Sequence, residues 1–384
     1  MIRNKILLPI LSILFGTLLT LFILEGVFRL LPVRDSFEAL AVNASNPIIR
    51  YTENRDVTWS LGADFSTISK KHINNYGFLN DQDYVTENNS PLLSVIGDSY
   101  VQADQVKNED SMHGVLSSIT KDNGRVYSFG ASGAPLSTYL AYAKYATEKF
   151  NSDRLVFIII GNDFDTSSTK YQDVAGFHYF AHNTENWDLI RKDYEPSPLR
   201  TIARKSAFVR YLVLNLQLNY EKIEKVFSKA DTGTRTYISN TAAEYNIERI
   251  TDSNRVVDRF FEELPKLTGL ESNKILFILD GIRPQLYESE ALKKVDSSYY
   301  AVMSKYFTKE ALDKGYEVID MQPAFIKEYA ATGKKFEYPT DGHWNEAGHL
   351  LAAKQIEKSN MFQGFLKESL SKIATENTTD NVSD

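Results

Sequence analysis

From residue 92 to the C-terminal region, the chain alternates short apolar runs with longer amphipathic segments. Five apolar runs predict strands: Leu92–Ile96, Arg125–Phe129, Arg154–Ile160, Lys274–Leu279 and Tyr316–Ile319. Four amphipathic segments predict helices: Met112–Thr120, Ser137–Lys149, Asp252–Leu264 and Glu346–Lys358. Apolar strands separated by helical crossovers are typical of a parallel sheet that helices cover on both faces. The pattern therefore predicts an α/β domain with a five-stranded parallel sheet.

A different apolar pattern lies at the N-terminus, where the run Ile6–Leu24 contains no charged residue. A helix needs about 20 apolar residues to cross the hydrocarbon core of a bilayer, so this run predicts a transmembrane anchor. Arg3 and Lys5 precede the run, and the positive-inside tendency places them in the cytoplasm and the remainder of the chain outside it. The alternative is a cleaved signal peptide. The length of the run and the lack of a small-x-small site after it favour an uncleaved anchor.

Polar stretches separate the anchor from the α/β pattern and interrupt that pattern once. The segment 166–273 is longer than a crossover needs and contains an amphipathic run at 207–227, so we expect a helical insertion there. The expected organisation is a cytoplasmic stub and anchor at 1–31, a polar extension at 32–90, the α/β domain at 91–370 with its insertion at about 166–273, and a polar tail at 371–384.

Composition narrows the function classes. The 384 residues carry a formal net charge of -7, and no basic tract is present, which argues against a nucleic-acid partner. The chain contains no cysteine, which excludes disulfides, thiolate metal sites and a cysteine nucleophile. These limits leave hydroxyl, imidazole and carboxylate groups as the candidate chemistry.

Three short motifs follow three of the predicted strands. Gly97-Asp98-Ser99 follows the first, Gly133 lies just beyond the second, and Gly161-Asn162-Asp163 follows the third. The carboxyl ends of parallel strands meet at one edge of a sheet, so these residues are expected to lie close together. Each motif alone is also an ordinary turn, which in the case of Gly97-Asp98-Ser99 would be a β-α turn with serine as the helix N-cap. Together they provide a hydroxyl nucleophile, and backbone and amide N–H donors for an oxyanion.

A fourth motif, Asp341-Gly342-His343, precedes the last predicted helix. His343 is a candidate general base, and Asp341 can orient its imidazole and stabilise the imidazolium. His349, one turn into the same helix, is the main rival for the role of base. The remaining histidines are read as structural: His72, His113, His178 and His182.

In this order the four motifs resemble those of the SGNH, or GDSL, hydrolase superfamily. The resemblance implies a flavodoxin-like three-layer α/β/α sandwich and a catalytic Ser99, His343 and Asp341. It also implies an oxyanion hole made by the backbone of Ser99, the backbone of Gly133 and the side chain of Asn162. The Asp-x-His-Trp-Asn form of the last block resembles the membrane-anchored branch that includes polysaccharide O-acetyltransferases of the alginate type.

Two positions depart from the usual family pattern. Tyr100 stands where the first block usually has Leu, a variation expected to change little. The acid of many members lies three residues before the histidine, where this chain has Thr340 instead. Asp341 lies two residues before His343 and is the candidate acid at this different spacing.

These features predict a serine esterase that forms an acyl-enzyme on O-acyl, especially O-acetyl, esters of extracytoplasmic glycans. An O-acetyltransferase that uses the same site is the first alternative, and it would need a separate membrane protein to supply the acyl group. A non-catalytic glycan-binding protein of the cell envelope is the second. Neither a cofactor nor a metal is expected, and the expected partners are an acylated glycan or small ester and the membrane.

Overall fold

The computed structural model describes residues 2–87, 90–121, 124–218, 237–238, 240–283, 285–287, 295–339 and 341–380. The chain divides into two compact units. The first consists of residues 1–38, 56–71 and 196–231, and the second of residues 39–55, 72–195 and 232–384.

The second unit is built on a five-stranded parallel sheet. Its strands are β3 (Leu92–Gly97), β4 (Arg125–Gly130), β5 (Arg154–Ile159), β10 (Ile275–Leu279) and β11 (Glu317–Asp320). They lie in the order β11-β10-β5-β3-β4, and every neighbouring pair is parallel. This is the flavodoxin-like strand order. The chain first adds β4 on one side of β3, and then adds β5, β10 and β11 in turn on the other side. The predicted fold class and all five predicted strands are confirmed.

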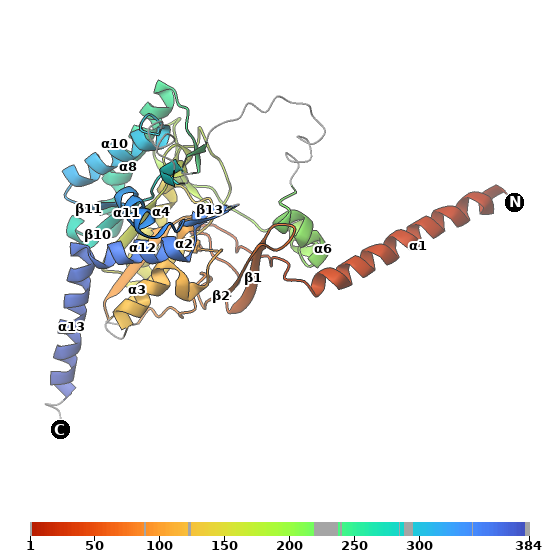
Figure 1. Ribbon diagram of the computed structural model, residues 1–384, viewed down its shortest axis with the longest axis horizontal. Coiled ribbons are helices and arrows are strands. Elements are labelled where there is room, and N and C mark those ends of the chain that lie inside the picture. Colours follow the sequence, from red (N-terminus) through yellow and green to blue (C-terminus); the bar gives the residue numbers. More distant parts are fainter. Residues whose placement is uncertain are drawn as a thin grey trace. The chain divides into compact units, whose positions relative to one another are not determined.

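Side-chain alternation along the strands divides the core into two layers. One face of the sheet packs on α4 (Leu136–Phe150), α8 (Ile247–Thr268) and α10 (Tyr299–Asp313). The other face packs on α3 (Met112–Thr120), α11 (Met321–Thr332), α12 (Glu346–Glu357) and α13 (Asn360–Asp380). Successive residues of a strand point to opposite faces, so Phe157 belongs to the first layer and Ile158 to the second. Figure 1 shows the resulting sandwich of sheet and helices.

The expected insertion at 166–273 has a different boundary in the structure. Its last part is α8, whose apolar stripe includes Val256, Phe260 and Leu264, all fully buried against the sheet. Because this stripe completes one core layer, α8 is part of the sandwich and not of an insertion. The helix expected at 207–227 is α6 (Ala207–Arg210) followed by the π turn η5 (Tyr211–Asn215). Its continuation beyond residue 218 lies outside the described residues.

The remaining short elements of the second unit are two-stranded. They are β6 (His178–Phe180) with β7 (Leu189–Arg191), β8 (Tyr237–Ile238) with β9 (Thr241–Ala242), and β12 (Glu337–Tyr338) with β13 (Asp341–Trp344). Part of the extension packs on the edge strand β4, where the Tyr84 ring stacks on Tyr127 at 3.8 Å and the Tyr84 hydroxyl donates to the carbonyl of Ser128 at 2.8 Å. A covered edge does not pair with other chains. The polar tail expected from residue 371 continues α13 as far as Asp380.

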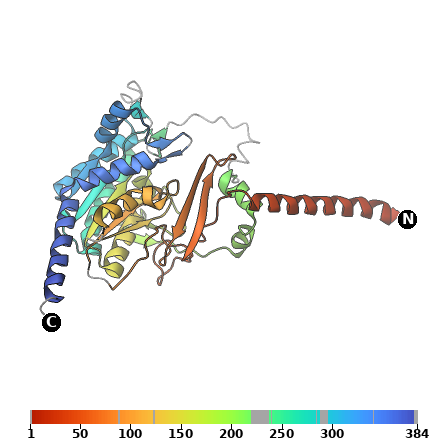
Figure 2. The same ribbon diagram turned by 60° about the horizontal axis from the view of Figure 1, so that its bottom comes forward.

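The first unit contains α1 (Ile2–Arg29), α5 (Pro198–Ala203), α6 and most of a two-stranded sheet of β1 (Arg55–Leu61) and β2 (Thr67–Ile73). Figures 1 and 2 both show the C-terminal end of α1 against α6. Within α1, Leu7–Arg29 is apolar and long enough to cross a membrane, and none of this stretch is buried inside the protein. Near the C-terminal end of α1, Glu25 pairs with Arg29 at 2.8 Å.

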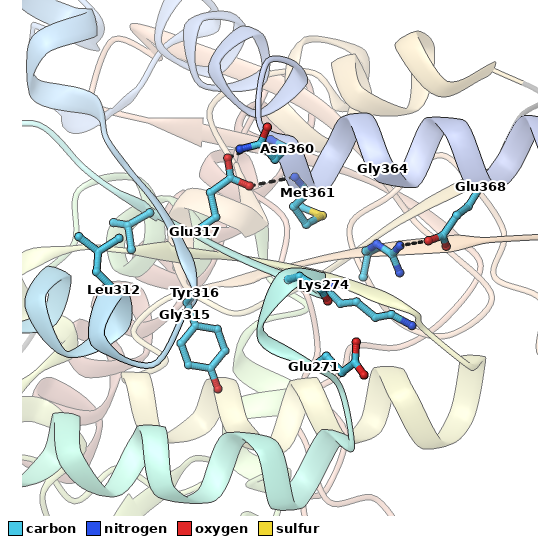
Figure 3. Close-up of a pocket in the computed structure, with 13 residues that line it drawn as sticks. Glu271, Lys274, Leu312, Gly315, Tyr316, Glu317, Asn360, Met361, Gly364 and Glu368 are labelled. Atoms are coloured by element: carbon cyan, nitrogen blue, oxygen red, sulfur yellow. Dashed lines mark hydrogen bonds and ion pairs between the residues drawn. The ribbon is translucent and has the colours of Figure 1, made fainter.

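A cavity of about 700 Å³ lies at the amino-terminal edge of the main sheet (Figure 3). Three of its charged side chains, those of Arg154, Glu317 and Glu368, have charged or backbone partners. Arg154 binds Glu368 at 2.6 Å, and the carboxylate of Glu317 accepts the backbone N–H groups of Asn360 and Met361, both at 2.9 Å. Arg154 and Glu317 are the first residues of β5 and β11, so the cavity lies at the edge opposite to the predicted catalytic motifs.

Candidate active site

Ser99 lies at the carboxyl end of the central strand β3, as the first residue of the four-residue helix α2 (Ser99–Gln102). The preceding residue, Asp98, is the N-cap of this helix, and its carboxylate accepts the backbone N–H of Tyr100 at 2.9 Å. The cap turns the chain sharply after the strand, so that the half-buried Ser99 side chain stands at the sheet edge.

The structure brings together Ser99 and His343, which are 244 positions apart in the sequence. The imidazole Nε2 of His343 lies 2.7 Å from the Ser99 Oγ. On the other side of the ring, Nδ1 makes a short hydrogen bond with the carboxylate of Asp341. An imidazole whose Nδ1 carries the proton presents its Nε2 lone pair to the hydroxyl, which is the tautomer that a general base requires.

The two-residue spacing between the acid and the histidine has a local explanation. The Asp341 carboxylate accepts the backbone N–H of His343 at 3.0 Å, which closes a tight turn and brings the same oxygen to the imidazole. The second carboxylate oxygen accepts the side-chain amide of Gln105 at 2.8 Å. Asp341 is thus in the position of a catalytic acid without the usual spacing. Thr340, at the usual position, lies outside the described residues.

The electrostatics of the pair suit a Ser–His–Asp arrangement. Burial raises the pKa of Asp341, but the hydrogen bonds and charge of His343, together with the Gln105 amide, outweigh it and lower this pKa to about 2. Burial lowers the pKa of His343, yet the Asp341 hydrogen bond and the negative charges of Asp341, Asp98 and Asp104 outweigh it and raise this pKa above the usual value. Asp341 therefore stabilises the imidazolium that forms when the base takes a proton.

The Ser99 hydroxyl has a second partner, since the Asp98 carboxylate lies 3.1 Å from its Oγ. The hydroxyl has one proton and donates it either to Asp98 or to His343. When the imidazole is protonated, it donates to Oγ and the hydroxyl is left to donate to Asp98. When the imidazole is neutral, the hydroxyl can donate to Nε2, so only this form of the site can start a nucleophilic attack.

The two predicted oxyanion residues flank Ser99 on neighbouring strands. Strands β4 and β5 are the immediate neighbours of β3, and Gly133 and Asn162 follow them. Gly133 has a φ of +82°, which favours glycine, and a Cβ added there would point into open space. The Oδ1 of Asn162 is buried and has no hydrogen-bond partner among the described residues, so no fold contact through this oxygen holds the amide. Both residues thus follow strands that flank β3, and their role as oxyanion donors stays a prediction.

The histidine that could have rivalled His343 is structural. His349 is buried in α12, and its Nδ1 accepts the backbone N–H of Met112 at 3.3 Å. This contact fastens α12 to the start of α3 on the second core layer. Among the described residues no cluster of three or more His, Cys, Asp or Glu side chains could hold a metal ion.

A buried arginine that the motifs do not include supports the histidine-bearing strand β13. Arg283 pairs with Asp280 at 2.6 Å, and Asp280 follows the carboxyl end of β10. Its remaining donors reach the carbonyl of Gly342 and the hydroxyl of Tyr100, both at 3.2 Å. The Asp280 carboxylate also accepts the indole N–H of Trp344 at 2.8 Å. The ion pair of Arg283 and Asp280 thus holds both residues that flank His343, because Arg283 binds Gly342 and Asp280 binds Trp344.

Tyr100 has a larger role than the sequence indicated. Its hydroxyl donates to the carbonyl of Gly342 at 3.0 Å, and its ring lies 5.0 Å from the His343 imidazole. We expected Tyr in place of Leu to change little, yet a leucine could make no hydrogen bond to that carbonyl. Gln105 and Arg283 were also missed. Asp280 had a usable signal, since an acidic residue directly follows a predicted central strand.

Comparisons with known proteins give structural likeness only. No protein-family model matches the sequence, and no curated protein sequence matches it significantly. Among solved structures, the chain is similar to a member of the lipolytic G-D-S-L family from Veillonella parvula, at 12% identity and a TM-score of 0.34, over 70% of this chain and 97% of the other. It is also similar to a catalytic mutant of an acetylxylan esterase from Geobacillus stearothermophilus, at 11% identity and a TM-score of 0.36, over 71% and 95% of the two chains. Likeness at this level does not assign an activity.

Proposed function

We propose that the protein is a serine esterase that hydrolyses ester bonds through an acyl-enzyme on Ser99. The observation that carries this proposal is the continuous chain from the Ser99 Oγ to His343 Nε2 at 2.7 Å, and from His343 Nδ1 to an Asp341 that Gln105 holds in place. A nucleophile, a base and an orienting acid in hydrogen-bond contact are the parts that acyl transfer requires.

The reaction follows from the geometry. His343 Nε2 takes the hydroxyl proton as Ser99 Oγ attacks the ester carbonyl, and Asp341 stabilises the imidazolium. The tetrahedral oxyanion is bound by the backbone N–H groups of Ser99 and Gly133 and the amide of Asn162. The imidazolium then protonates the departing alkoxide, which leaves the acyl group on Ser99. His343 next takes a proton from water, the hydroxide attacks the acyl carbon, and Ser99 Oγ recovers the proton as the acid product departs.

We further propose O-acyl, and in particular O-acetyl, groups of extracytoplasmic glycans as the substrate. The support is the apolar helix α1, which would anchor the chain to a membrane, with Arg3 and Lys5 on the cytoplasmic side. The Asp-x-His-Trp-Asn block, which resembles that of glycan-acylating enzymes, points the same way. A transferase would need a separate membrane protein to supply the acyl group, whereas an esterase would need none, which favours hydrolysis over transfer.

The reaction is tested with the purified full-length chain and a small activated acetyl ester. Ser99→Ala should lower kcat/KM on the order of 10⁴-fold, and His343→Ala should do so to a similar extent, because the two residues act as one unit. The matched control is Ser118→Ala, which changes an exposed serine on α3 and should leave the rate unchanged. Full activity in both Ser99→Ala and His343→Ala would refute the proposal.

The direction of acyl transfer is tested in cells. Glycan O-acetylation is compared between cells that carry the native chain and cells that carry Ser99→Ala. An esterase predicts more acetyl groups in the variant. Fewer acetyl groups would instead identify an O-acetyltransferase. Tight binding of the purified chain to an envelope glycan, without turnover of any acylated form, would favour a glycan-binding protein.

A further inference from the structure

The end of the apolar helix sets the depth at which the first unit would meet a bilayer. The uncharged run Ile6–Leu24 spans about 28 Å at 1.5 Å per residue, close to the roughly 30 Å of the hydrocarbon core. Glu25 therefore lies at the boundary. Its carboxylate accepts the hydroxyl of Ser206 at 2.6 Å and the backbone N–H groups of Ala207 and Phe208, both at 3.1 Å. These bonds hold the start of α6 at the level of the interface.

Aromatic side chains gather at the same level. The ring of Phe28 lies 5.4 Å from that of Phe208 and 4.4 Å from that of Tyr211, and Tyr211 lies 5.7 Å from Phe65. Tyrosine is enriched where membrane proteins cross the interface, and Tyr211 is the tyrosine of this group. The position of this group, at the end of the apolar run, agrees with the depth set by Glu25.

Helix α5 lies directly before this region in the chain and has no buried residue over its six positions. Its two large apolar side chains, Leu199 and Ile202, are 80% and 65% exposed. They are three residues apart and so lie on one face of the helix. A helix this short is unstable in water unless its apolar face is covered. The segment after α5 is tied to the anchor, because the Arg29 guanidinium donates to the carbonyl of Lys205 at 3.5 Å.

Basic side chains accompany this exposed apolar face. Arg200 lies between the two apolar residues, Arg204 and Lys205 follow the helix, and Arg29 ends the anchor. Arg200, Lys205 and Arg29 are exposed or largely exposed to solvent. An apolar face beside cations is the pattern of a segment that lies in the headgroup region of an anionic bilayer.

We propose that residues 198–205 form a membrane-surface contact. In this arrangement Leu199 and Ile202 enter the upper acyl region, and Arg200 and Lys205 bind anionic lipid headgroups beside the exit of the anchor. The contact gives the first unit a second attachment to the bilayer and stops it from rotating freely about the end of α1. The proposal requires that α1 spans the membrane, but it does not depend on the proposed esterase activity.

The absence of cysteine from the whole chain makes a direct test possible. Single variants Leu199→Cys and Ile202→Cys of the full-length chain carry an environment-sensitive fluorophore in liposomes of phosphatidylcholine with 30% phosphatidylglycerol. We expect blue-shifted emission and at least twofold stronger quenching by lipids spin-labelled near the carbonyl than by aqueous iodide. A Leu14→Cys probe in the anchor should be quenched by lipids labelled deep in the acyl chain. If it is not, the span is wrong and the proposal with it.

Two matched controls lie at opposite edges of the second unit. Leu312, beside the cavity, is 55% exposed, and Val174, near the residues that contact Gly133, is 48% exposed. Whichever way that unit lies, at least one of these probes faces water and is quenched by iodide. The proposal would be overturned if iodide quenched the probes at positions 199 and 202 as strongly as it quenches the more accessible of the two controls.

The charge component has its own test. The double substitution Arg200→Gln and Lys205→Gln is compared with Lys354→Gln and Lys367→Gln, which remove the same charge from exposed positions of the second unit. Lipid quenching of the Leu199→Cys probe should rise when phosphatidylglycerol is added to pure phosphatidylcholine. The first pair should abolish that rise and the second pair should keep it. A quenching signal that is independent of anionic lipid would overturn the role of the cations.

Discussion

The two edges of the main sheet each contain a buried arginine paired with a carboxylate, yet the two pairs serve different ends. At the amino-terminal edge Arg154 binds Glu368, and it also reaches the carbonyl and, at 3.9 Å, the carboxylate of the adjacent Asp153. At the carboxyl edge Arg283 binds Asp280 and also reaches the carbonyl of Gly342, next to His343. The two pairs therefore differ in the arginine N–H groups that do not bind the paired carboxylate. In Arg283 such a group reaches a residue beside His343, and in Arg154 it reaches the neighbouring residue in the sequence.

The difference has a topological origin. Loops from the carboxyl ends of parallel strands converge, so a group after β10 can touch a group on β13 and another on α2. At the opposite edge Glu317 and Arg154 connect strands β11 and β5 to α13. The comparison predicts that equivalent substitutions at the two edges separate activity from stability.

The largest expected effect, beyond loss of the nucleophile or base, is at the acid. Asp341→Asn should lower kcat on the order of 10³-fold, because the amide can no longer stabilise the imidazolium or select its tautomer. Steady-state kinetics on an activated acetyl ester measure it. Glu317→Gln, at the opposite edge, should leave kcat unchanged. If Asp341→Asn retains near-native kcat, the site operates as a Ser–His dyad or uses another acid.

The paired arginines give the next effect. Arg283→Lys keeps a charge beside Asp280 but loses the planar donors to Gly342 and Tyr100, so we expect kcat to fall about 10-fold with little change in KM. Arg154→Lys should leave kcat unchanged and lower the free energy of unfolding by about 1–2 kcal/mol. Kinetics and denaturant melts on both variants measure the contrast. An equal fall in kcat for both would remove the distinction between the edges.

A single hydroxyl tests the same idea at a smaller scale. Tyr100→Phe removes the donor to the Gly342 carbonyl while keeping the ring against His343, and should reduce kcat by about fivefold, the equivalent of one net hydrogen bond of about 1 kcal/mol. Tyr316→Phe, beside the cavity, should not alter kcat. No change in Tyr100→Phe would show that Arg283 alone holds the strand.

The smallest effect concerns pH. His343 acts as a base only when neutral, so kcat/KM should rise with pH through its pKa, which lies above the ordinary value of 6.5. The negative charge of Asp104 contributes to that increase, so Asp104→Asn should move the midpoint of the rate profile to lower pH. Glu271→Gln, at the cavity, should leave it in place. A midpoint that moves upward in Asp104→Asn would contradict this electrostatic account.

The sheet could be predicted because its information is local and redundant. Val156-Phe157-Ile158-Ile159 reads as a buried strand in isolation, and five such runs with helical crossovers leave few topologies. Ser99 and His343 could be predicted for a related reason, because each lies where a predicted element ends or begins. The boundaries of the expected insertion could not, since whether α8 belongs to the core depends on which surface its apolar stripe meets.

By itself the sequence determined the fold class, the apolar N-terminal helix and the candidate nucleophile, base and acid, because strand pattern, hydropathy and short motifs are encoded in adjacent residues. Only the tertiary structure decided that Asp341 reaches the imidazole at a two-residue spacing, since this depends on a turn that its own carboxylate closes. It alone showed that Tyr100, Gln105 and Arg283 contact the strand that contains His343, and that Glu25 binds the start of α6. Their partners lie from about 60 to more than 240 positions away along the chain, so no local pattern records them, and folding brings them into contact.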